Sequence, residues 1–185
     1  MQNCLGIYIE NNLIKYAKVS KDRDTFKVDA FGIRFFDNLN EAIKKIVEET
    51  YSFTTPISIN LANEQYLYYD IFALLSKNDI QKTVETEFET FCDENKYNQK
   101  AFETRYALVS NVQNKERIKA IQVIVNKIEL NKQKQYLEKH NLSGILPIGT
   151  AIASITRFEK KENVLIVNME EKTTITTIYD RQIYN

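Results

Sequence analysis

The chain has 185 residues, enough for a globular body with a buried core, and 43% of its residues are hydrophobic while 27% are charged. Its 25 Lys and Arg residues balance its 25 Asp and Glu residues, so the formal net charge is zero. Proteins that bind nucleic acid carry a basic excess or a basic stripe, and because this sequence has neither, nucleic acid is not an expected partner.

The first 35 residues predict three β-strands. Leu5 to Val19 alternates apolar and polar residues on both sides of Glu10-Asn11-Asn12, and asparagine tolerates the left-handed backbone that a tight turn requires. This segment is therefore predicted to form a hairpin of two strands, and Thr25 to Ile33 is predicted to form a third antiparallel strand.

A first helix is predicted after Asn38, which is followed three residues later by Glu41, as in a capping box. Its apolar positions at helical spacing are Ile43, Ile46, Val47 and Tyr51. Two strands follow, Pro56–Leu61 and Gln65–Phe72, joined by the short link Ala62-Asn63-Glu64.

A second helix is predicted after Ser76, with Asp79 completing its capping pattern, and Asp93 to Gln99 is a predicted loop. The helix has an apolar stripe of Ile80, Val84, Phe88 and Phe91. Stripes of this kind are how helices dock on a core, so we interpret this one as packing rather than as a cofactor site.

The rest of the chain alternates strands and helices up to a second hairpin. The predicted elements are strands Phe102–Val112 and Arg117–Asn126, helix Lys127–His140, strand Gly144–Pro147 and helix Ile148–Phe158. The second hairpin pairs Val164–Asn168 with Thr173–Tyr179, and Gln182–Tyr184 follows it.

Two hairpins of one type, each opening an α/β run, indicate an internal duplication. The predicted order is βββαββα, then ββαβα, then βββ. We expect a first subdomain at residues 1–94, an inserted α/β subdomain at 95–147, and a return to the first subdomain at 148–185 that starts a second-half hairpin.

This arrangement resembles the actin-like ATPase superfamily, and most closely the branch with the type IV pilus assembly protein PilM, the cell-division protein FtsA and the cytoplasmic part of the type II secretion protein GspL. Its first hairpin, Leu-Gly-Ile-Asp-Ile-Gly-x-x-x-Ile-Lys, is matched by residues 5–15. Its second, Val-Leu-Val-Asp-Ile-Gly-x-x-x-Thr, is matched by residues 164–174. PilM fits best, since a capped helix like Ser76–Phe91 follows its second long strand. The resemblance covers essentially the whole chain and implies an α/β fold: an actin-like, ribonuclease H-like half with an inserted small α/β subdomain.

In that superfamily the two hairpins bind phosphate, because glycine lets backbone N–H groups close on the anion while aspartate organises a metal and its waters. Here Tyr8 and Asn168 stand at the Asp positions, and Glu10 and Glu170 stand at the Gly positions, where a carboxylate repels an anion. The degenerate loops are completed by Asn11, Asn12, Lys15, Thr173 and Thr174. We therefore expect no ATP hydrolysis and no bound cofactor, with an actin-like ATPase that still binds Mg-ATP as the alternative.

The superfamily also has a second large half that carries its adenosine-binding segment, and this sequence stops at Asn185 as that half begins. The sequence leaves open whether it is a fragment or a relative that lost the nucleotide half. Either case predicts an exposed strand edge, which is a site for self-association or for pairing with another chain.

Other candidate chemistry has a simpler structural interpretation. The single histidine, His140, lies at a predicted helix C-terminus, where a capping role is expected rather than catalysis. Cys4 and Cys92 have no metal-type spacing and are interpreted as thiols of a cytosolic protein. The acidic residues Glu85, Glu87, Glu89, Asp93 and Glu94 form a solvated helix face. No metal site is expected.

No run of apolar residues approaches the about 20 residues that a membrane span needs, and no signal peptide is recognisable.

By resemblance, PilM-type proteins are cytoplasmic platforms that hold a short N-terminal peptide of an inner-membrane partner. The leading hypothesis is therefore a scaffold of a type IV pilus or type II secretion-like machine, peripheral to the inner membrane through that partner. An FtsA-like cell-division tether is a further alternative and requires an amphipathic membrane helix that this sequence lacks. Since tyrosines bury area with little entropy loss, the expected peptide groove is lined by Tyr66, Tyr68, Phe72, Val84, Phe88, Phe102 and Tyr106.

Overall fold

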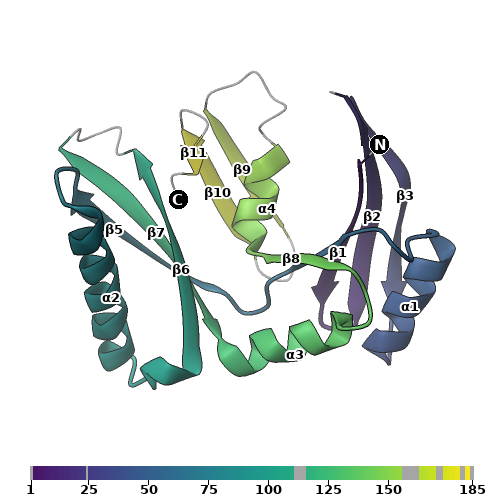
Figure 1. Ribbon diagram of the computed structural model, residues 1–185, viewed down its shortest axis with the longest axis horizontal. Helices are drawn as coiled ribbons and strands as arrows, with labels where there is room; N and C mark the ends of the chain where they lie inside the picture. The colour runs from purple at the N-terminus through teal and green to yellow at the C-terminus, as the bar shows by residue number, and fades with distance from the viewer. Residues whose placement is uncertain are drawn as a thin grey trace. The chain divides into compact units, whose positions relative to one another are not determined.

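The computed structural model describes residues 2–23, 25–110, 116–155, 163–169, 173–179 and 182–183 (Figure 1). The chain divides into two compact units. Unit 1 comprises residues 1–61 and 130–146, and unit 2 comprises residues 62–129 and 147–185. Each unit is described by itself below.

Unit 1 is a five-stranded sheet in the order β3-β2-β1-β4-β8. Its strands are β1 (Gln2–Glu10), β2 (Leu13–Asp22), β3 (Thr25–Phe35), β4 (Ile57–Asn60) and β8 (Leu142–Leu146). The first three are antiparallel, as predicted, and β4 and β8 add to β1 in parallel. The connection from β3 to β4 contains helix α1 (Leu39–Glu49), and helix α3 (Lys127–Leu137) precedes β8.

Helix α1 begins where the sequence predicts. The Asn38 side chain accepts hydrogen bonds from the backbone N–H groups of Asn40 and Glu41 and so satisfies two donors that no helical carbonyl can reach. The prediction that Tyr51 is an apolar position of this helix is wrong, because the helix has already ended at Thr50. Tyr51 takes a left-handed backbone with φ of 49°, and its side chain is 83% exposed.

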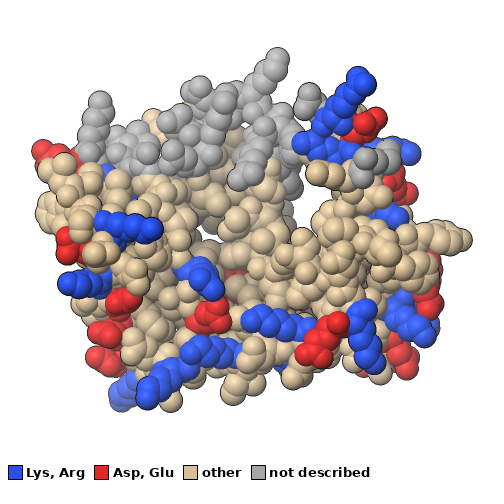
Figure 2. Space-filling view, in the orientation of Figure 1, with Lys and Arg blue, Asp and Glu red and all other residues tan. Residues whose placement is uncertain are grey.

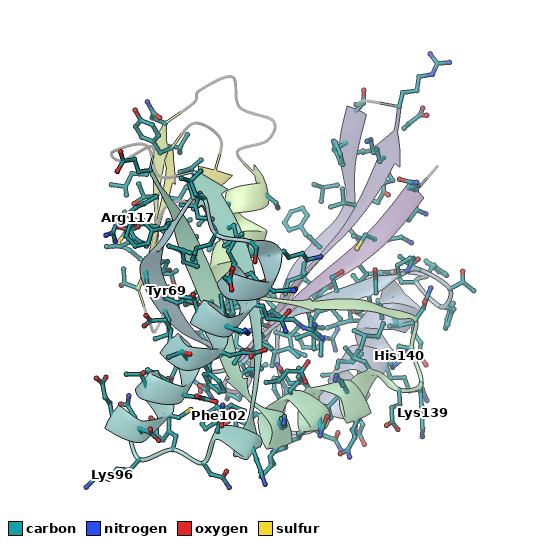
Figure 3. The ribbon with its side chains drawn as sticks, turned by 60° about the vertical axis from the view of Figure 1, so that its left-hand side comes forward. Tyr69, Lys96, Phe102, Arg117, Lys139 and His140 are labelled. Carbon is teal, nitrogen blue, oxygen red and sulfur yellow. The ribbon has the colours of Figure 1, made fainter. Side chains whose placement is uncertain are left out.

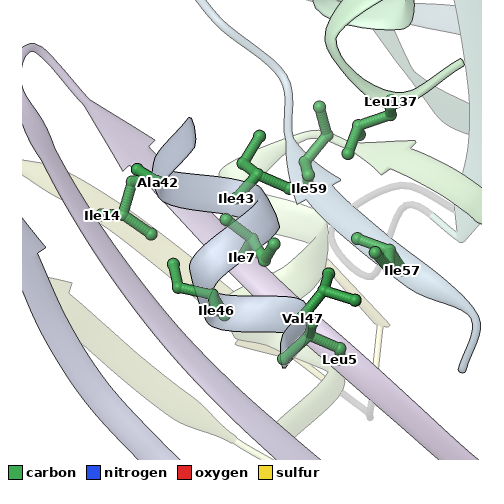
Figure 4. Packing of buried hydrophobic residues seen from close by; sticks show 10 residues of the cluster. All are labelled: Leu5, Ile7, Ile14, Ala42, Ile43, Ile46, Val47, Ile57, Ile59 and Leu137. Atoms are coloured by element: carbon green, nitrogen blue, oxygen red, sulfur yellow. The ribbon is translucent and has the colours of Figure 1, made fainter. Parts of the chain in front are cut away.

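One face of the sheet forms the core of unit 1. Alternate residues of β1, β2 and β4 point to it, and α1 covers them with the apolar side of its turns (Figure 4). The buried residues, each at most 5% exposed, are Leu5, Ile7, Ile14, Ala42, Ile43, Ile46, Val47, Ile57, Ile59 and Leu137. Burying an aliphatic side chain contributes about 1.5–3 kcal/mol, so this cluster is the main stabilising feature of the unit.

Asn60 extends the parallel pairing of β4 with β1 beyond its last backbone rung, which joins Ile59 to Ile7. Its Oδ1 accepts a hydrogen bond from the Ile9 N–H at 2.7 Å, and its Nδ2 donates to the Ile9 carbonyl at 3.0 Å. A side-chain amide therefore replaces a peptide group and satisfies both polar groups of Ile9.

Unit 2 contains two antiparallel three-stranded sheets, in the orders β5-β7-β6 and β11-β10-β9. The first is built from β5 (Gln65–Phe72), β6 (Phe102–Ser110) and β7 (Arg117–Asn126), with helix α2 (Lys77–Glu94) on one face and the 3-10 turn η1 (Gln99–Ala101) before β6. The second is built from β9 (Val164–Asn168), β10 (Thr174–Tyr179) and β11 (Gln182–Ile183), preceded by helix α4 (Ile148–Ile155). Ser76 caps α2 as predicted, since its hydroxyl oxygen accepts a hydrogen bond from the Asp79 N–H.

The predicted element order agrees with the structure, but the boundaries of the subdomains differ. Residues 65–94 were expected in the first subdomain, yet β5 pairs with β7 and α2 packs on their common sheet, so they belong with the insertion. Conversely, β8 was expected in the insertion, yet it pairs with β4 of unit 1. Helix α2 also continues to Glu94, two residues into the predicted loop.

Replacing Asn60 by alanine should lower the stability of unit 1 by about 1–3 kcal/mol, because the N–H and C=O groups of Ile9 lose their partner. Urea denaturation and hydrogen exchange at the Ile9 amide measure this effect. Asn40→Ala is the matched control, since the Asn40 side chain is exposed on α1. Equal stability and equal Ile9 exchange in the two variants would contradict the bridging role.

Candidate functional site

The first of the two loops that the sequence predicts to be degenerate phosphate loops is a tight hairpin turn in unit 1. Glu10 pairs with Leu13, and the left-handed conformation falls on Asn11, with φ of 50°. Glu10 itself, at the family's Gly position, does not have a positive φ. The backbone thus reaches its turn without glycine and places a half-buried carboxylate where the family keeps the loop open for phosphate.

Lys15, the cation of this loop, lies over the ring of Tyr8. The two residues are cross-strand partners, and the Lys15 Nζ is 5.5 Å from the centroid of the Tyr8 ring. This is a cation–π contact. Because Tyr8 stands at the family's Asp position, the hairpin has an aromatic face in place of the carboxylate that would hold a metal and its waters.

The second degenerate loop is in unit 2, between β9 and β10. Asn168 pairs with Thr174 at the end of the ladder, and Thr173 precedes β10. Glu170 lies outside the described residues. Among the residues that the structure describes, no group of three or more His, Cys, Asp or Glu side chains is arranged to hold a metal ion.

The residues predicted to line one peptide groove lie on two opposite faces of the β5-β7-β6 sheet. Tyr66, Tyr68 and Phe72 pair with Val123, Ile121 and Arg117 of β7. Phe102 and Tyr106 pair with Asn126 and Gln122, which are even-numbered residues of the same strand. Since successive side chains of a strand alternate between faces, the two groups cannot line one groove.

Val84 and Phe88 are not groove residues, which corrects the prediction for them. Val84 is 4% exposed and packs with Ile71 and Ala120, while Phe88 is 7% exposed and packs with Ile124. These contacts attach α2 to the sheet, which is the packing role that the apolar stripe itself predicts. Phe102 joins the same layer and stacks on Tyr97, with ring centroids 5.2 Å apart.

The α2 face also holds a buried polar pair. The Tyr69 hydroxyl donates a hydrogen bond to Oε1 of Gln122 at 3.0 Å, and Gln122 is 1% exposed. Burial raises the pKa of Tyr69 above its usual range, and the nearby Glu87 carboxylate adds to this shift. Tyr69 therefore stays neutral and acts as a structural hydrogen-bond donor.

On the other face, Tyr66 and Glu64 anchor the start of α4. Oε1 of Glu64 accepts hydrogen bonds from the Ile148 N–H at 2.9 Å and from the Tyr66 hydroxyl at 3.3 Å. The Tyr66 hydroxyl also lies beside Gly149, close to where a Cβ would stand. Burial, followed by the charge of Glu64, raises the pKa of Tyr66 above its usual range. Glu64 thus satisfies one N–H group of the first helical turn, and Tyr66 packs beside it in a structural role.

Further along β5, Tyr68 and Phe72 remain accessible. Tyr68 is 40% exposed and stacks on Tyr66 with ring centroids 6.1 Å apart, while Phe72 is 57% exposed. The guanidinium carbon of Arg117 lies 4.5 Å from the centroid of the Phe72 ring. Figure 3 shows Arg117 and Phe102 at opposite ends of the sheet, with Tyr69 between them. Leu74, just beyond β5, is 98% exposed.

We define the β5 edge surface as Tyr68, Phe72, Leu74 and Arg117. In the order β5-β7-β6, β5 is terminal, so among the described residues of that sheet its outer side has no strand neighbour. A shallow depression along α2 is lined by other residues, namely Leu75, Asp79, Lys82, Thr83, Thr86 and Glu87. The β5 edge surface combines exposed aromatic rings, a cation and a strand edge, which are features of peptide-binding surfaces.

Sequence reasoning missed three residues of this region: Glu64, Leu74 and Arg117. Glu64 was placed in a link, and its partner Ile148 is 84 residues further along the chain, so no local pattern could connect them. Arg117 was identified only as the first residue of a strand. Its neighbour Phe72 lies on β5, and the antiparallel pairing of β5 with β7 that brings the two residues together was not predicted from the sequence.

The remaining candidate residues have structural settings. His140 lies three residues beyond the end of α3, and partial burial lowers its pKa. Cys92 is 2% exposed, and burial raises the pKa of its thiol, whereas the Cys4 Sγ lies 3.8 Å from the Ser58 hydroxyl; both cysteines are free. The acidic residues of the α2 face are all exposed: Glu85, Glu87, Glu89, Asp93 and Glu94.

The charged surface is mixed. On the face shown in Figure 2, Lys and Arg side chains are interspersed with Asp and Glu side chains. None of the helices within the described parts of the chain has both the length and the apolar character needed to cross a membrane.

Two solved structures share this fold. A chain of a PilM-PilN type IV pilus biogenesis complex matches with a TM-score of 0.77 and 12% identity, over 98% of this chain and 60% of that chain. The cytoplasmic domain of EpsL, an inner membrane component of the type II secretion system of Vibrio cholerae, matches with a TM-score of 0.65 and 13% identity, over 97% of this chain and 69% of that chain. No protein-family model matches the sequence, and neither does any curated protein.

These likenesses establish the fold. The chain has the mixed α/β fold of these two solved structures, and the match to them confirms the predicted structural resemblance to PilM and to the cytoplasmic part of a type II secretion protein. The chain spans 60% of the length of the matched chain in the PilM-PilN complex.

Replacing Glu64 by alanine should loosen the start of α4, because the Ile148 N–H loses its acceptor and the Tyr66 hydroxyl loses one partner. Amide hydrogen exchange at Ile148 and Gly149 should accelerate by about 5–30-fold, which corresponds to about 1–2 kcal/mol. Tyr66→Phe should affect Gly149 more than Ile148. The control is Glu138→Ala, an exposed residue of unit 1. Wild-type exchange rates in Glu64→Ala would refute the anchor.

Proposed function

We propose that this chain is a PilM-like, non-catalytic scaffold of a type IV pilus or type II secretion-like assembly machine, which binds a short peptide of an inner-membrane partner. The observation that carries the proposal is the fold shared with a PilM-PilN complex and with the cytoplasmic domain of an inner-membrane secretion component. On this proposal the chain works on the cytoplasmic side of the inner membrane and is held there by its partner.

The β5 edge surface is the proposed peptide site. A peptide in extended conformation adds to β5 as a further strand, and its backbone pairs with the outer side of β5. Tyr68 and Phe72 lie on one face of β5 four residues apart, so they contact alternate side chains of the added strand. Apolar residues of the peptide pack on the two rings, and a carboxylate of the peptide is attracted to Arg117.

The geometry of the first hairpin supports a scaffold over an ATPase. Glu10 puts a carboxylate in the turn, and the Lys15 ammonium is engaged with the Tyr8 ring. A triphosphate at this turn would meet like charge, and its metal would lack the aspartate of the family pattern. The actin-like ATPase remains the alternative function and is tested directly below.

The peptide proposal is tested by using the tagged chain as bait in membranes of its native host. We expect recovery of a single-pass inner-membrane protein, and Tyr68→Ala and Phe72→Ala should each reduce its recovery at least tenfold, since exposed aromatic anchors dominate such contacts. A synthetic N-terminal peptide of the recovered protein should then bind the chain in a fluorescence anisotropy titration, with the same sensitivity to both variants.

Tyr106→Ala is the matched control, because Tyr106 is the same residue type with nearly the same exposure, 39% against 40% for Tyr68, on the opposite face of the sheet. It should leave recovery unchanged. If Tyr106→Ala abolishes binding while Tyr68→Ala preserves it, the peptide site lies on the α2 face. If no membrane protein is recovered, the scaffold proposal fails.

For the nucleotide alternative, calorimetric titration with Mg-ATP up to about 1 mM should give no saturable heat, because both the turn carboxylate and the engaged lysine oppose phosphate binding. The same titration of Glu10→Gly shows whether the carboxylate alone is responsible. Saturable heat with the wild-type chain that Lys15→Ala abolishes would establish nucleotide binding at this hairpin and favour the actin-like ATPase.

A further inference from the structure

The edge strand β3 of unit 1 carries five exposed apolar side chains on one face. Their exposed fractions run from 45% to 80% for Phe26, Val28, Phe31, Ile33 and Phe35. They pair with alternate residues of β2, namely Lys21, Val19, Ala17, Lys15 and Leu13, which places all five on a single face. We call this set the β3 row.

A β-bulge keeps the row on one face. The step of three residues from Val28 to Phe31 would send the two halves of the strand to opposite faces if the pairing were regular. The register instead shifts between Lys18 and Val19, where Ala30 and Val28 are successive partners, so Asp29 is the extra residue. The irregularity therefore assembles an exposed apolar row rather than interrupting it.

The row lies on the face of the sheet that α1 does not cover. The core residues of β1 and β2 under α1 are Leu5, Ile7 and Ile14. Ile14 pairs with Arg34, and Lys15 pairs with Ile33, so the core and the row belong to opposite faces. Apolar patches on monomers are seldom larger than a few hundred Å², so we interpret the β3 row as part of a contact surface.

The strand also lacks the usual protection of a sheet edge. Natural edge strands are short or carry free charges, whereas β3 has 11 residues and ends the sheet. Each of its charged side chains is paired within the chain. Lys27 lies 3.5 Å from Asp29, and Arg34 binds both carboxylate oxygens of Glu49, at 2.7 and 2.6 Å. A second strand can approach without bringing unpaired charges together.

We propose that β3 is a self-association edge, at which two copies of this chain pair their β3 strands antiparallel about a two-fold axis. A pairing centred on Gly32 sets Phe31 of one copy opposite Ile33 of the other, twice by symmetry. The apolar rows then lie side by side across the junction, and the outer N–H and C=O groups of each strand find partners.

The edge itself supports a second copy as the occupant, because β3 ends the sheet and the two-fold axis sets Phe31 and Ile33 opposite each other at its centre. Strand pairing continues the sheet in its own plane, so it buries the flanks of the two rows where they meet and leaves their faces exposed. The buried area is therefore small for a specific interface, and the contact is expected to be a weak, reversible dimer with a dissociation constant in the micromolar range.

Sedimentation equilibrium of the full chain between about 1 and 100 μM tests the proposal. We expect a concentration-dependent rise from 21.7 kDa toward twice that mass. Phe31→Lys and Ile33→Lys should each raise the dimer dissociation constant at least tenfold, because each lysine then lies opposite an apolar side chain of the other copy and diagonal to the other lysine. Circular dichroism melting checks the fold of each variant, and Phe31→Ser is a milder second variant.

Ile128→Lys is the matched control, since Ile128 is 76% exposed but lies in unit 2, and it should leave the dimer unchanged. A chain that stays monomeric up to 100 μM overturns the proposal. A dimer that Leu165→Lys dissociates but Phe31→Lys does not also overturns it, because association would then use the exposed face of β9, where Leu165 is 64% exposed. The β5 edge proposal is independent of either result, since partner recovery by Phe31→Lys reports on it separately.

Discussion

The alternation of side chains along β7 decides which face of its sheet each residue of the neighbouring strands occupies. β7 is the central strand of its sheet, and its even-numbered residues Ala120, Gln122 and Ile124 face α2, while Ile121 and Val123 face the opposite side. Through the ladder, this register assigns every residue of β5 and β6 to one face. It is why Val84 and Phe88 are core residues, why Tyr66 meets α4, and why Tyr68 and Phe72 lie on the face that α2 does not cover.

How much of this the sequence could predict follows from the range of each interaction. The Asn38 and Ser76 caps and the Glu10-Asn11-Asn12 turn depend on neighbours within a few residues, and all three are present as predicted. The subdomain boundaries depend on pairing between distant strands, as of β8 with β4, and there the prediction fails. The predicted residue set of the peptide groove is incorrect for the same reason. A list of aromatic residues does not say which face of the sheet each one occupies until the strand register is known.

The two hairpins illustrate the opposite case, in which a residue pattern predicts the strands without predicting their chemistry. The strands and the turn of the first hairpin are present as predicted, but Tyr8 and Glu10 stand where the pattern of the resembled family has Asp and Gly. Hairpin folding depends on alternation and on a residue that tolerates a positive φ, which Asn11 supplies. Phosphate binding depends in addition on charge, so the fold can persist where nucleotide chemistry is disfavoured.

The clear pKa shifts among the described residues share one main physical cause, which is burial. Where burial shifts a pKa clearly, the shift favours the neutral form at physiological pH: upward for Tyr66, Tyr68, Tyr69 and Cys92, and downward for His140. An acid–base catalyst needs the reverse, a group brought toward neutrality by its surroundings. Tyr66 and Tyr69 instead act as neutral hydrogen-bond donors, Tyr66 to Glu64 at the start of α4 and Tyr69 to Gln122 within the sheet.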